Sequence, residues 1–595
     1  MSIFIRVRKT ATFLFILFFI SACSIIGVHF KLHNPKRAGK YPEPTKKLTL
    51  LGDQDSKYRS GFDVTFYDIS VSFGQELNDD AFITGCVIMR CTAVKECDTI
   101  QLDVADGMEV SFLRLTDLKN LRNASGYKEV YTYLGTNSVR RGNALLIALP
   151  RKYLAGEKFN IGLNYKTKPP NAKRPPWKGG FVRKKDDLGN PWWGVACQSE
   201  GASMWWPCKD VVNDEPDSCL IALCVPDSLV AVSNGQFIRC PQVGGGIDGR
   251  DNGNLNWEWR VTYPINLYNI TFYIGKYKLL HDDYISKVTG DTLPLNHYVL
   301  VQHYDQAKEH FKQLKNHLAV YEELFGPYPF YNDGFKLVES PYAGMEHQTA
   351  IAYGNKFKNN YLGFDYIILH ETAHEWWGNS LTAYDLAEGW LHEGFATYAE
   401  CLYVERTKGY QAYKDYLRTY KWTIINRRPL VGVYGLRYFN YKDGDIYTKG
   451  AWVLHTLRET IHNDSVFFDI IKTFATRYAY KNVTSKEFIS VVNEKTGSDY
   501  QWFFDQYLYN RFVPELEYYQ AGDEFYYRWN TDFCEKDFDL PIVLKTAPSQ
   551  YDTIVPAWNL QVLKCTKDVP VEVSSNVLVR FTETKKITRQ HKVKF

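Results

Sequence analysis

The chain has 595 residues, of which 45% are hydrophobic, 23% charged and 16% aromatic, and its formal net charge is +4 at pH 7. A chain of this length exceeds a single hydrophobic core, so several domains are expected, and its hydrophobic and charged fractions are those of a globular protein. The small net charge and the lack of a long block of like charges argue against a nucleic-acid partner.

The N-terminus has the pattern of an export signal. Basic residues precede the apolar segment "ATFLFILFFI", and "ISAC" at 20–23 follows it. This order predicts a signal peptide at 1–22 whose end resembles a bacterial lipobox, with Cys23 as the lipidated first residue of the mature chain. The alternative is an uncleaved signal anchor, because apolar residues continue through 24–30. Both interpretations predict an extracytoplasmic, membrane-anchored protein in the periplasm or on the cell surface.

The rest of the chain divides into regions that differ in the spacing of apolar residues and in their content of turn-forming residues. Residues 23–49 include a basic stretch with prolines and no periodicity, which predicts a tether. Short β-type runs between turn-rich gaps predict an N-terminal β domain at 50–285. Helical spacing of apolar residues dominates 286–512, the expected catalytic domain, and short strands return at 513–595, enough for a small C-terminal β domain. No CxxC pair occurs among the 12 cysteines, which argues against zinc-ribbon and thioredoxin-like domains.

One segment, "DYIILHETAHEWWGNS" at 365–380, predicts a metal centre. His370 and His374 are four residues apart, so they lie on one face of a helix and can direct two imidazoles at one zinc ion. Glu371 is placed to act as the general base on a metal-bound water. The apolar flanking residues predict a buried helix, and buried histidines need polar partners. A metal centre therefore explains the segment better than a surface helix does.

A catalytic zinc ion needs a third protein ligand. The segment "WLHEGFATYAE" at 390–400 supplies Glu393, which is expected to face inward while the apolar side chains bury the helix. Glu400 lies about two helical turns further along the same helix, and Glu388 precedes it. Spacing favours Glu393 but leaves both rivals open.

The chain combines an HExxH motif, eighteen intervening residues and a glutamate within W-L-x-E-G-F-A. This combination resembles the zinc aminopeptidases of the aminopeptidase N family, which includes the bifunctional leukotriene hydrolase. The resemblance implies a multidomain α+β fold with an N-terminal β-saddle domain, a thermolysin-like helical catalytic domain and a small C-terminal β-sandwich. It implies no long C-terminal helical domain of the kind that caps the cleft in larger members. It covers nearly all of the mature chain, through "QSEGASMWWPCKD" at 198–210, "FGPYPF" at 325–330, "SPYAGMEHQTAIAYG" at 340–354 and "DIYTKGAWVLHTLR" at 445–458.

The resemblance also implies the catalytic roles. His370, His374 and Glu393 are expected to bind one Zn²⁺ per chain, with Glu371 as the general base. Tyr447, within "YTKGA", matches the tyrosine that hydrogen-bonds the developing oxyanion.

The expected substrates are peptides with a free N-terminus. Glu346 and Glu200 match the two carboxylates that pair with the N-terminal ammonium, and Gln198 is expected to join them. Gly344 and Met345 would line the cleft. These residues favour an aminopeptidase over a thermolysin-like endopeptidase.

The sequence departs from the family pattern close to these residues. His347 replaces an asparagine, Ala343 replaces a glycine, His392 stands where asparagine is common and Glu388 where aspartate is common. Every reacting residue is nevertheless present. A peptide-binding surface protein is therefore less favoured, because a pure binder has no use for a general base. An epoxide hydrolase is also less favoured, because the closing helical domain is not expected here.

Overall fold

The computed structural model gives the fold of most of the chain. Among the residues that it describes, no helix combines the length and the apolar character needed to cross a membrane. The predicted signal peptide, Cys23 and most of the predicted tether lie outside the described residues. The structure describes residues 32, 34–35, 37–41, 55–74, 77–78, 80–117, 131–133, 137–243, 253–567, 569–573 and 576–585.

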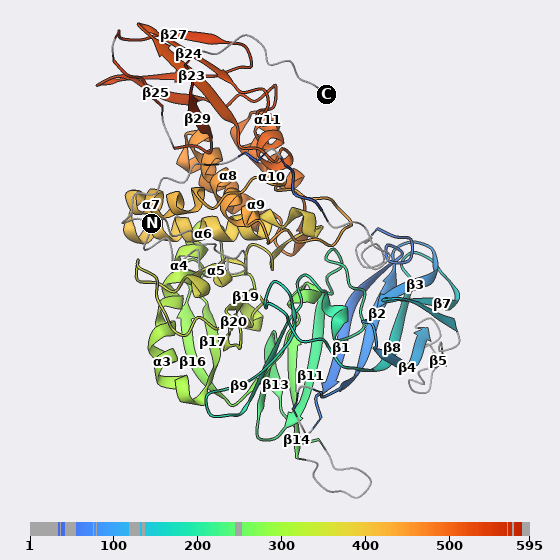
Figure 1. Ribbon diagram of the computed structural model, residues 1–595. Helices are drawn as coiled ribbons and strands as arrows, with labels where there is room; N and C mark the ends of the chain where they lie inside the picture. Colours follow the sequence, from blue (N-terminus) through green and yellow to red (C-terminus); the bar gives the residue numbers. More distant parts are fainter. Residues whose placement is uncertain are drawn as a thin grey trace, which may run out of the picture.

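The N-terminal region is built around a mixed sheet (Figure 1). Its strand β1 (Phe62–Ser72) pairs in parallel with β11 (Ser218–Pro226) and antiparallel with β2 (Ile83–Ala93). Buried side chains of β1, such as Ile69 and Val71, alternate with more exposed ones, because successive residues of a strand point to opposite faces. The sheet order is β13-β14-β11-β1-β2-β8-β4-β5, with Glu109–Asp117 (β4), Tyr131–Tyr133 (β5), Lys158–Thr167 (β8), Gln236–Arg239 (β13) and Asn254–Val261 (β14).

Two smaller sheets complete this region, and one of them positions part of the cleft described below. The hairpin of β9 and β10 pairs the first residue of β9 with the last residue of β10. The loop before β9 and the segment after β10 therefore emerge at the same end of the sheet. The sheet orders are β3-β7-β6 and β12-β15-β10-β9, with Cys97–Asp103 (β3), Ser138–Arg141 (β6), Ala144–Tyr153 (β7), Gly180–Lys185 (β9), Pro191–Ala196 (β10), Val230–Val232 (β12) and Tyr273–Gly275 (β15).

A five-stranded sheet opens the region that the sequence predicted to be catalytic. Its strands β16 (Tyr277–Ile285) and β17 (Thr292–Leu300) pair along their whole length, so this sheet starts before the predicted domain boundary at residue 285. At its other edge β19 (Gly344–Met345) runs antiparallel to β20 (Ile351–Tyr353). The strand β18 (Leu337–Glu339) lies between β17 and β20. A separate parallel pair is formed by β21 (Leu381–Ala383) and β22 (Lys481–Val483).

The helices pack around α6 (Trp390–Lys408), which contacts α5, α7 and α8. α6 and α8 cross at two glycines: a Cβ added to Gly450 would lie 2.8 Å from the Cα of Gly394. This close approach brings the first turns of both helices together. The other helices are Tyr304–His310 (α3), Leu314–Phe325 (α4), Tyr366–Ala373 (α5), Tyr410–Lys421 (α7), Asp445–Ile461 (α8), Asp464–Arg477 (α9), Ser485–Thr496 (α10) and Gln501–Phe504 (α11).

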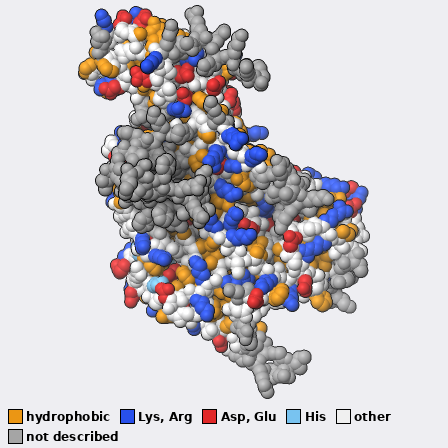
Figure 2. Space-filling model, in the orientation of Figure 1, with side chains coloured by type: hydrophobic (Ala, Val, Ile, Leu, Met, Phe, Trp, Pro, Cys, Tyr) orange, Lys and Arg blue, Asp and Glu red, His pale blue; other side chains and the backbone are white. Residues whose placement is uncertain are grey.

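The C-terminal region consists of two small sheets beyond the helices (Figure 1). Apolar side chains gather among charged ones on its surface at the top of Figure 2, and Val543, Tyr551 and Val562 are exposed. The predicted multidomain α+β class is confirmed. The sheet orders are β27-β24-β23-β29 and β26-β25-β28, with Glu515–Ala521 (β23), Glu524–Trp529 (β24), Ile542–Ala547 (β25), Gln550–Ile554 (β26), Gln561–Lys564 (β27), Glu572–Val573 (β28) and Arg580–Glu583 (β29).

Part of the segment expected to be a tether lies against the folded body. The amide of Asn34 donates to the carbonyl of Val513 at 2.7 Å and accepts from its N–H at 3.1 Å. The N–H of Gly39 donates to the carbonyl of Arg427 at 2.8 Å. These bonds fix Asn34 to the start of the C-terminal region and Gly39 to the loop that precedes α8. The cysteines that the structure describes are all free thiols.

Candidate active site

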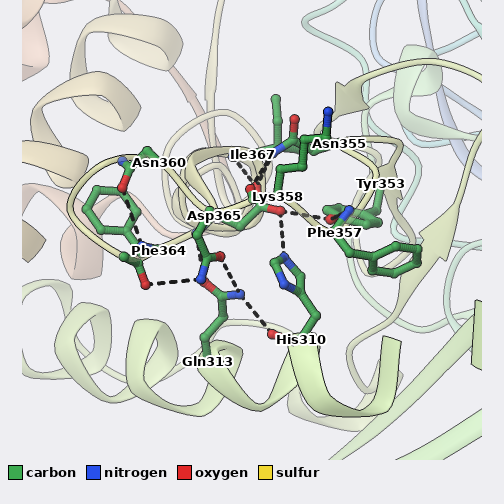
Figure 3. A network of polar contacts seen from close by, with 12 residues as sticks. His310, Gln313, Tyr353, Asn355, Phe357, Lys358, Asn360, Phe364, Asp365 and Ile367 are labelled. Carbon is green, nitrogen blue, oxygen red and sulfur yellow. Dashed lines mark hydrogen bonds and ion pairs between the residues drawn. The ribbon is translucent and has the colours of Figure 1, made fainter. Parts of the chain in front are cut away.

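The helix α5 is held at its first turn by the buried carboxylate of Asp365 (Figure 3). As the N-cap, this carboxylate accepts a hydrogen bond from the N–H of Ile367 at 3.0 Å. It also accepts bonds of 2.8 Å from His310, Tyr353 and Asn355. A buried carboxylate is stable when its lone pairs are satisfied in this way, and the network fixes where α5 starts.

α5 presents the two predicted histidines on one face. His370 lies within the helix, and His374 follows its last residue with helical backbone angles, so the four-residue spacing keeps both rings together. Their Nε2 atoms are 3.2 Å apart, and each lies 3.4 Å from Oε2 of Glu393 in the first turn of α6. Three ligands in a tetrahedral zinc site, each about 2.0–2.1 Å from the ion, are about 3.3–3.4 Å apart. The observed triangle has this size.

The chemistry of Glu393 fits the same ion. Its Oε2 is buried and accepts no hydrogen bond from any residue that the structure describes. Burial alone raises the pKa of this carboxyl, but the imidazoles of His374 and His370 outweigh burial and lower the pKa to about 2. The group is therefore anionic, and a bound cation would satisfy its free oxygen. The residues present fit zinc.

The outer nitrogens of the two histidines are also bound. Nδ1 of His370 lies 2.8 Å from Oε1 of Glu400, and Nδ1 of His374 lies 2.8 Å from the carbonyl of Trp377. Both acceptors keep the proton on Nδ1 and leave the Nε2 lone pairs for the metal. Glu400, the other candidate for the third ligand on α6, therefore accepts a hydrogen bond from Nδ1 of His370 and does not face the Nε2 atoms. The other rival, Glu388, accepts hydrogen bonds from Tyr434 and Ser485, away from the three ligand atoms.

The cavity beside the three ligands is lined by Gln198, Gly344, Met345 and Glu346, four of the five residues predicted to bind substrate. The buried carboxylate of Glu346 accepts a hydrogen bond from the amide of Gln198 at 2.7 Å and from the phenol of Tyr268 at 3.2 Å. This places a buried carboxylate next to the metal centre. No motif in the sequence indicated Tyr268.

The structure places the fifth residue, Glu200, elsewhere. It is not among the residues that line the cavity, and its carboxylate accepts a hydrogen bond from the N–H of Gly179 at 2.9 Å. The prediction treated Glu200 as a partner of the substrate ammonium. The carboxylate is instead directed at a backbone amide, because the loop before β9 lies beside the segment after β10.

Glu371 faces the same cavity and is buried. A Cβ added to Gly344 would lie 2.5 Å from its Oε1, so the glycine leaves the space that this carboxylate occupies. Burial raises the pKa of Glu371 to about 8; the neighbouring His370 and His374 lower it and Glu346 raises it further. A carboxylate whose pKa lies near neutrality is suited to accept a proton and return it.

Tyr447 lies in the first turn of α8 and lines the cavity. Its ring is stacked near that of His370, with centroids 6.2 Å apart and an interplanar angle of 26°. The contact between Gly394 and Gly450 brings this turn of α8 beside the turn of α6 that carries Glu393. The cavity also includes Trp177 from the loop before β9, a residue that no motif in the sequence indicated.

Comparison with known proteins finds similarity to one family over the part of the chain that carries this site. Residues 309–507 match the model described as the Peptidase family M1 domain. This segment, about a third of the chain, is similar to the domain that the model describes. Aminopeptidase N of Streptomyces lividans is 26% identical over 289 residues, which are 44% of this chain and 33% of that protein. Leukotriene A-4 hydrolase of Xenopus laevis is 22% identical over 401 residues, which are 64% of this chain and 62% of that protein.

The chain therefore spans between about a third and three fifths of the length of these curated relatives. The fold is shared over more of its length. The crystal structure of an M1 zinc metallopeptidase from Deinococcus radiodurans superposes with a TM-score of 0.61 at 20% identity and covers 76% of this chain and 95% of that one. A two-domain M1 zinc metallopeptidase mutant bound to L-tryptophan gives a TM-score of 0.63 at 20% identity, covering 78% and 96%. The chain thus shares a multidomain fold with these solved structures over about three quarters of its length.

Proposed function

We propose that this protein is a zinc-dependent aminopeptidase that releases N-terminal amino acids from peptides. The observation that carries the proposal is the triangle of His370, His374 and Glu393, with edges of 3.2, 3.4 and 3.4 Å, beside the buried carboxylate of Glu346. Zinc, when bound, supplies a Lewis acid that polarises the scissile carbonyl and makes water more acidic.

The protein's own residues supply proton transfer and charge stabilisation. Glu371 accepts the proton of the attacking water and passes it to the leaving amine, which its buried position in the cavity supports. Tyr447 donates a hydrogen bond to the oxygen on which negative charge develops. Both residues line the same cavity as the three metal ligands.

Glu346 accounts for the preference for a free N-terminus. A peptide ammonium entering the cavity meets a buried carboxylate already positioned by Gln198 and Tyr268. A charge-assisted bond in a water-poor site is strong, whereas an acetylated N-terminus cannot form it. Gly344 and Met345 line the cavity next to this anchor. One of the similar solved structures is described as bound to a Tyr-Ser-Ala substrate, which supports peptides as the substrate class.

The test is hydrolysis of a panel of aminoacyl chromogens by the wild type and by Glu371→Gln, with and without chelator. We expect the chelator and the substitution each to abolish turnover. Glu323→Gln is the matched control, because this carboxylate on α4 is 62% exposed and pairs with Arg406 on the surface. Equal rates for wild type and Glu371→Gln would remove Glu371 from the mechanism. Equal cleavage of acetyl-capped and free peptides would indicate an endopeptidase instead.

We also propose that the chain is an exported, lipid-anchored protein of a bacterial membrane, with Cys23 as the lipidated residue. The order of basic, apolar and small residues before Cys23 supports this proposal. Labelling of the expressed protein with a radioactive fatty acid tests it. We expect label in the wild type and none in Cys23→Ser, and an unlabelled wild-type protein that stays in the membrane fraction would favour the uncleaved signal anchor.

A further inference from the structure

The loop before β9 carries a basic turn that reaches the cavity. Within "AKRPPWKGG" at 172–180, the N–H of Arg174 donates to the carbonyl of Lys178 at 3.1 Å, and the N–H of Lys178 donates back at 2.8 Å. Two prolines and Trp177 form the tip of the turn between them, and both Pro176 and Trp177 line the cavity. The two basic residues therefore stand on either side of a tip that forms part of the cavity wall.

The turn is held in place by the segment that carries Gln198. The hydroxyl of Ser199 donates to the carbonyl of Trp177 at 3.2 Å, and the carboxylate of Glu200 accepts from the N–H of Gly179 at 2.9 Å. A Cβ on Gly179 would lie 2.0 Å from the carbonyl oxygen of Ala196, so the two segments approach as closely as a glycine permits. The turn therefore keeps one position relative to the cavity.

The basic residues of the turn project their charge at the rim of the cavity. Lys173, Arg174 and Lys178 are all exposed. The guanidinium of Arg174 lies over the indole of Trp177, 5.3 Å from the ring centroid, which keeps this cation beside the cavity wall. No carboxylate oxygen that the structure describes lies within ion-pair distance of these three cations. Glu200, beside the turn, is directed at a backbone N–H instead.

The interior of the cavity has the opposite charge. No Lys or Arg is present among the described residues that line it, whereas four carboxylates are: Glu346, Glu371, Glu393 and Glu400. A peptide bound by its N-terminal ammonium in this interior extends toward the rim with the residues that follow. The arrangement of charges therefore matches a peptide that is positive at its first residue and negative shortly after it.

We propose that Arg174 and Lys178 determine specificity by favouring peptides with Asp or Glu at the second or third position. The proposal rests on the proposed function, in which Glu346 binds the N-terminal ammonium. A side chain near the scissile bond lies at a fixed distance from that anchor, whereas the distance of the C-terminal carboxylate changes with peptide length. An arginine beside a lysine binds a carboxylate through charge-assisted hydrogen bonds. An acidic first residue would instead enter the acidic interior and is disfavoured.

The test is hydrolysis of C-terminally amidated peptides that begin with leucine and carry Asp, Asn or Lys at the second or third position. Amidation removes the terminal carboxylate as a competing ligand. We expect the wild-type kcat/KM to be about threefold to fivefold higher for Asp than for Asn, the range of an exposed ion pair, and lower for Lys. High salt is expected to remove this preference, because it screens exposed charges.

The variants locate the effect in the turn. Arg174→Gln and Lys178→Gln are each expected to reduce the preference for Asp over Asn, and the double variant is expected to abolish it. Arg174→Glu should favour the Lys peptides instead. Hydrolysis of the Asn peptides is expected to stay within about twofold of the wild type in all four proteins, because an uncharged side chain gains little from the cations.

Lys185→Gln is the matched control. This exposed lysine is the last residue of β9, whereas Gly180, next to the turn, is the first. The six residues of the strand span about 16 Å, more than the Debye length of about 8 Å at physiological ionic strength. Lys185→Gln is therefore expected to keep the wild-type preference, although it removes the same charge. Melting temperature and zinc content establish that each variant is folded.

Equal kcat/KM for the Asp and Asn peptides in the wild type would overturn the proposal. So would a preference for Asp that survives in the Arg174→Gln Lys178→Gln double variant or in high salt. Binding of the same peptides by Glu371→Gln measures the preference without turnover, and equal affinities for Asp and Asn peptides would overturn the proposal as well. A wild-type protein that binds zinc and these peptides but hydrolyses none of them contradicts the proposed function, which is a separate result.

Discussion

Glu400→Gln isolates the contribution of the carboxylate behind the metal ligands. Oε1 of Glu400 lies 2.8 Å from Nδ1 of His370, and Oε2 accepts bonds from Tyr416 at 2.7 Å and Tyr420 at 2.8 Å. Glutamine is nearly the same size and keeps one oxygen for the histidine. It removes the charge and replaces the acceptor of both phenols with an NH₂ group, which cannot accept their hydrogen bonds.

The expected magnitude follows from this geometry. The carboxylate holds the Nδ1 proton of His370 and makes Nε2 more basic, and loss of such a partner typically weakens metal affinity about 10- to 100-fold. That range corresponds to about 1.4–2.8 kcal/mol. His374 is not affected, because its Nδ1 faces the carbonyl of Trp377, which a side-chain substitution does not alter. The effect is therefore expected at one of the two imidazoles only.

Zinc affinity is measured by competition with a coloured chelator of known affinity. Tyr416→Phe and Tyr420→Phe are controls, since each removes one hydrogen bond to Glu400 but leaves its charge. We expect both to bind zinc within about threefold of the wild type, because the charge that acts on His370 remains and the other phenol still donates to Glu400. An unchanged zinc affinity in Glu400→Gln, in a folded protein, would refute the reasoning that this carboxylate tunes the ligand.

Three further outcomes are expected. Gly344→Ala adds a methyl group that would lie 2.5 Å from Oε1 of Glu371, so this carboxylate has to move. We expect kcat to fall about 100-fold with zinc content unchanged, and a normal kcat would contradict this expectation. Removing zinc by chelation should lower the free energy of unfolding by about 3–4 kcal/mol relative to protein in zinc at 100–1,000 times Kd, and added zinc should restore it; an unchanged melting curve excludes a bound ion. Acid should destabilise the protein below about pH 6.5, because burial lowers the pKa of His297, His317 and His455 to about 3.

The sign of the acid effect follows from proton uptake. These histidines are neutral in the folded state and become protonated on unfolding, so their stabilisation is present above the unfolded pKa of about 6.5 and is lost as pH falls toward 3. Between these two pKa values, each histidine lowers the free energy of unfolding by about 1.4 kcal/mol for every pH unit of acidification. His317→Phe tests the slope, because its ring nitrogens have no hydrogen-bond partner among the described residues and its ring packs 4.9 Å from that of Tyr403. A slope identical to that of the wild type would show that His317 does not contribute.

Local sequence patterns were sufficient to predict the metal helix and the overall class of the fold. Four-residue spacing places His370 and His374 on one face whatever the rest of the chain does, because the helical repeat is local. Alternating apolar residues in the strands and helical spacing in the middle of the chain likewise predicted an α+β protein. The comparisons support this class, and residues 309–507 are similar to the M1 peptidase domain.

The choice between residues that the local pattern treats alike depends on the packing of distant segments. Glu393 and Glu400 lie about two turns apart on one face of α6, and which of them meets the imidazole Nε2 atoms depends on how α5 lies against α6. Trp177 and Glu200 acquire their places because the hairpin of β9 and β10 brings the segments at its two ends together beside the cavity. Contacts between distant segments follow from packing rather than from periodicity, so the sequence pattern alone did not specify them.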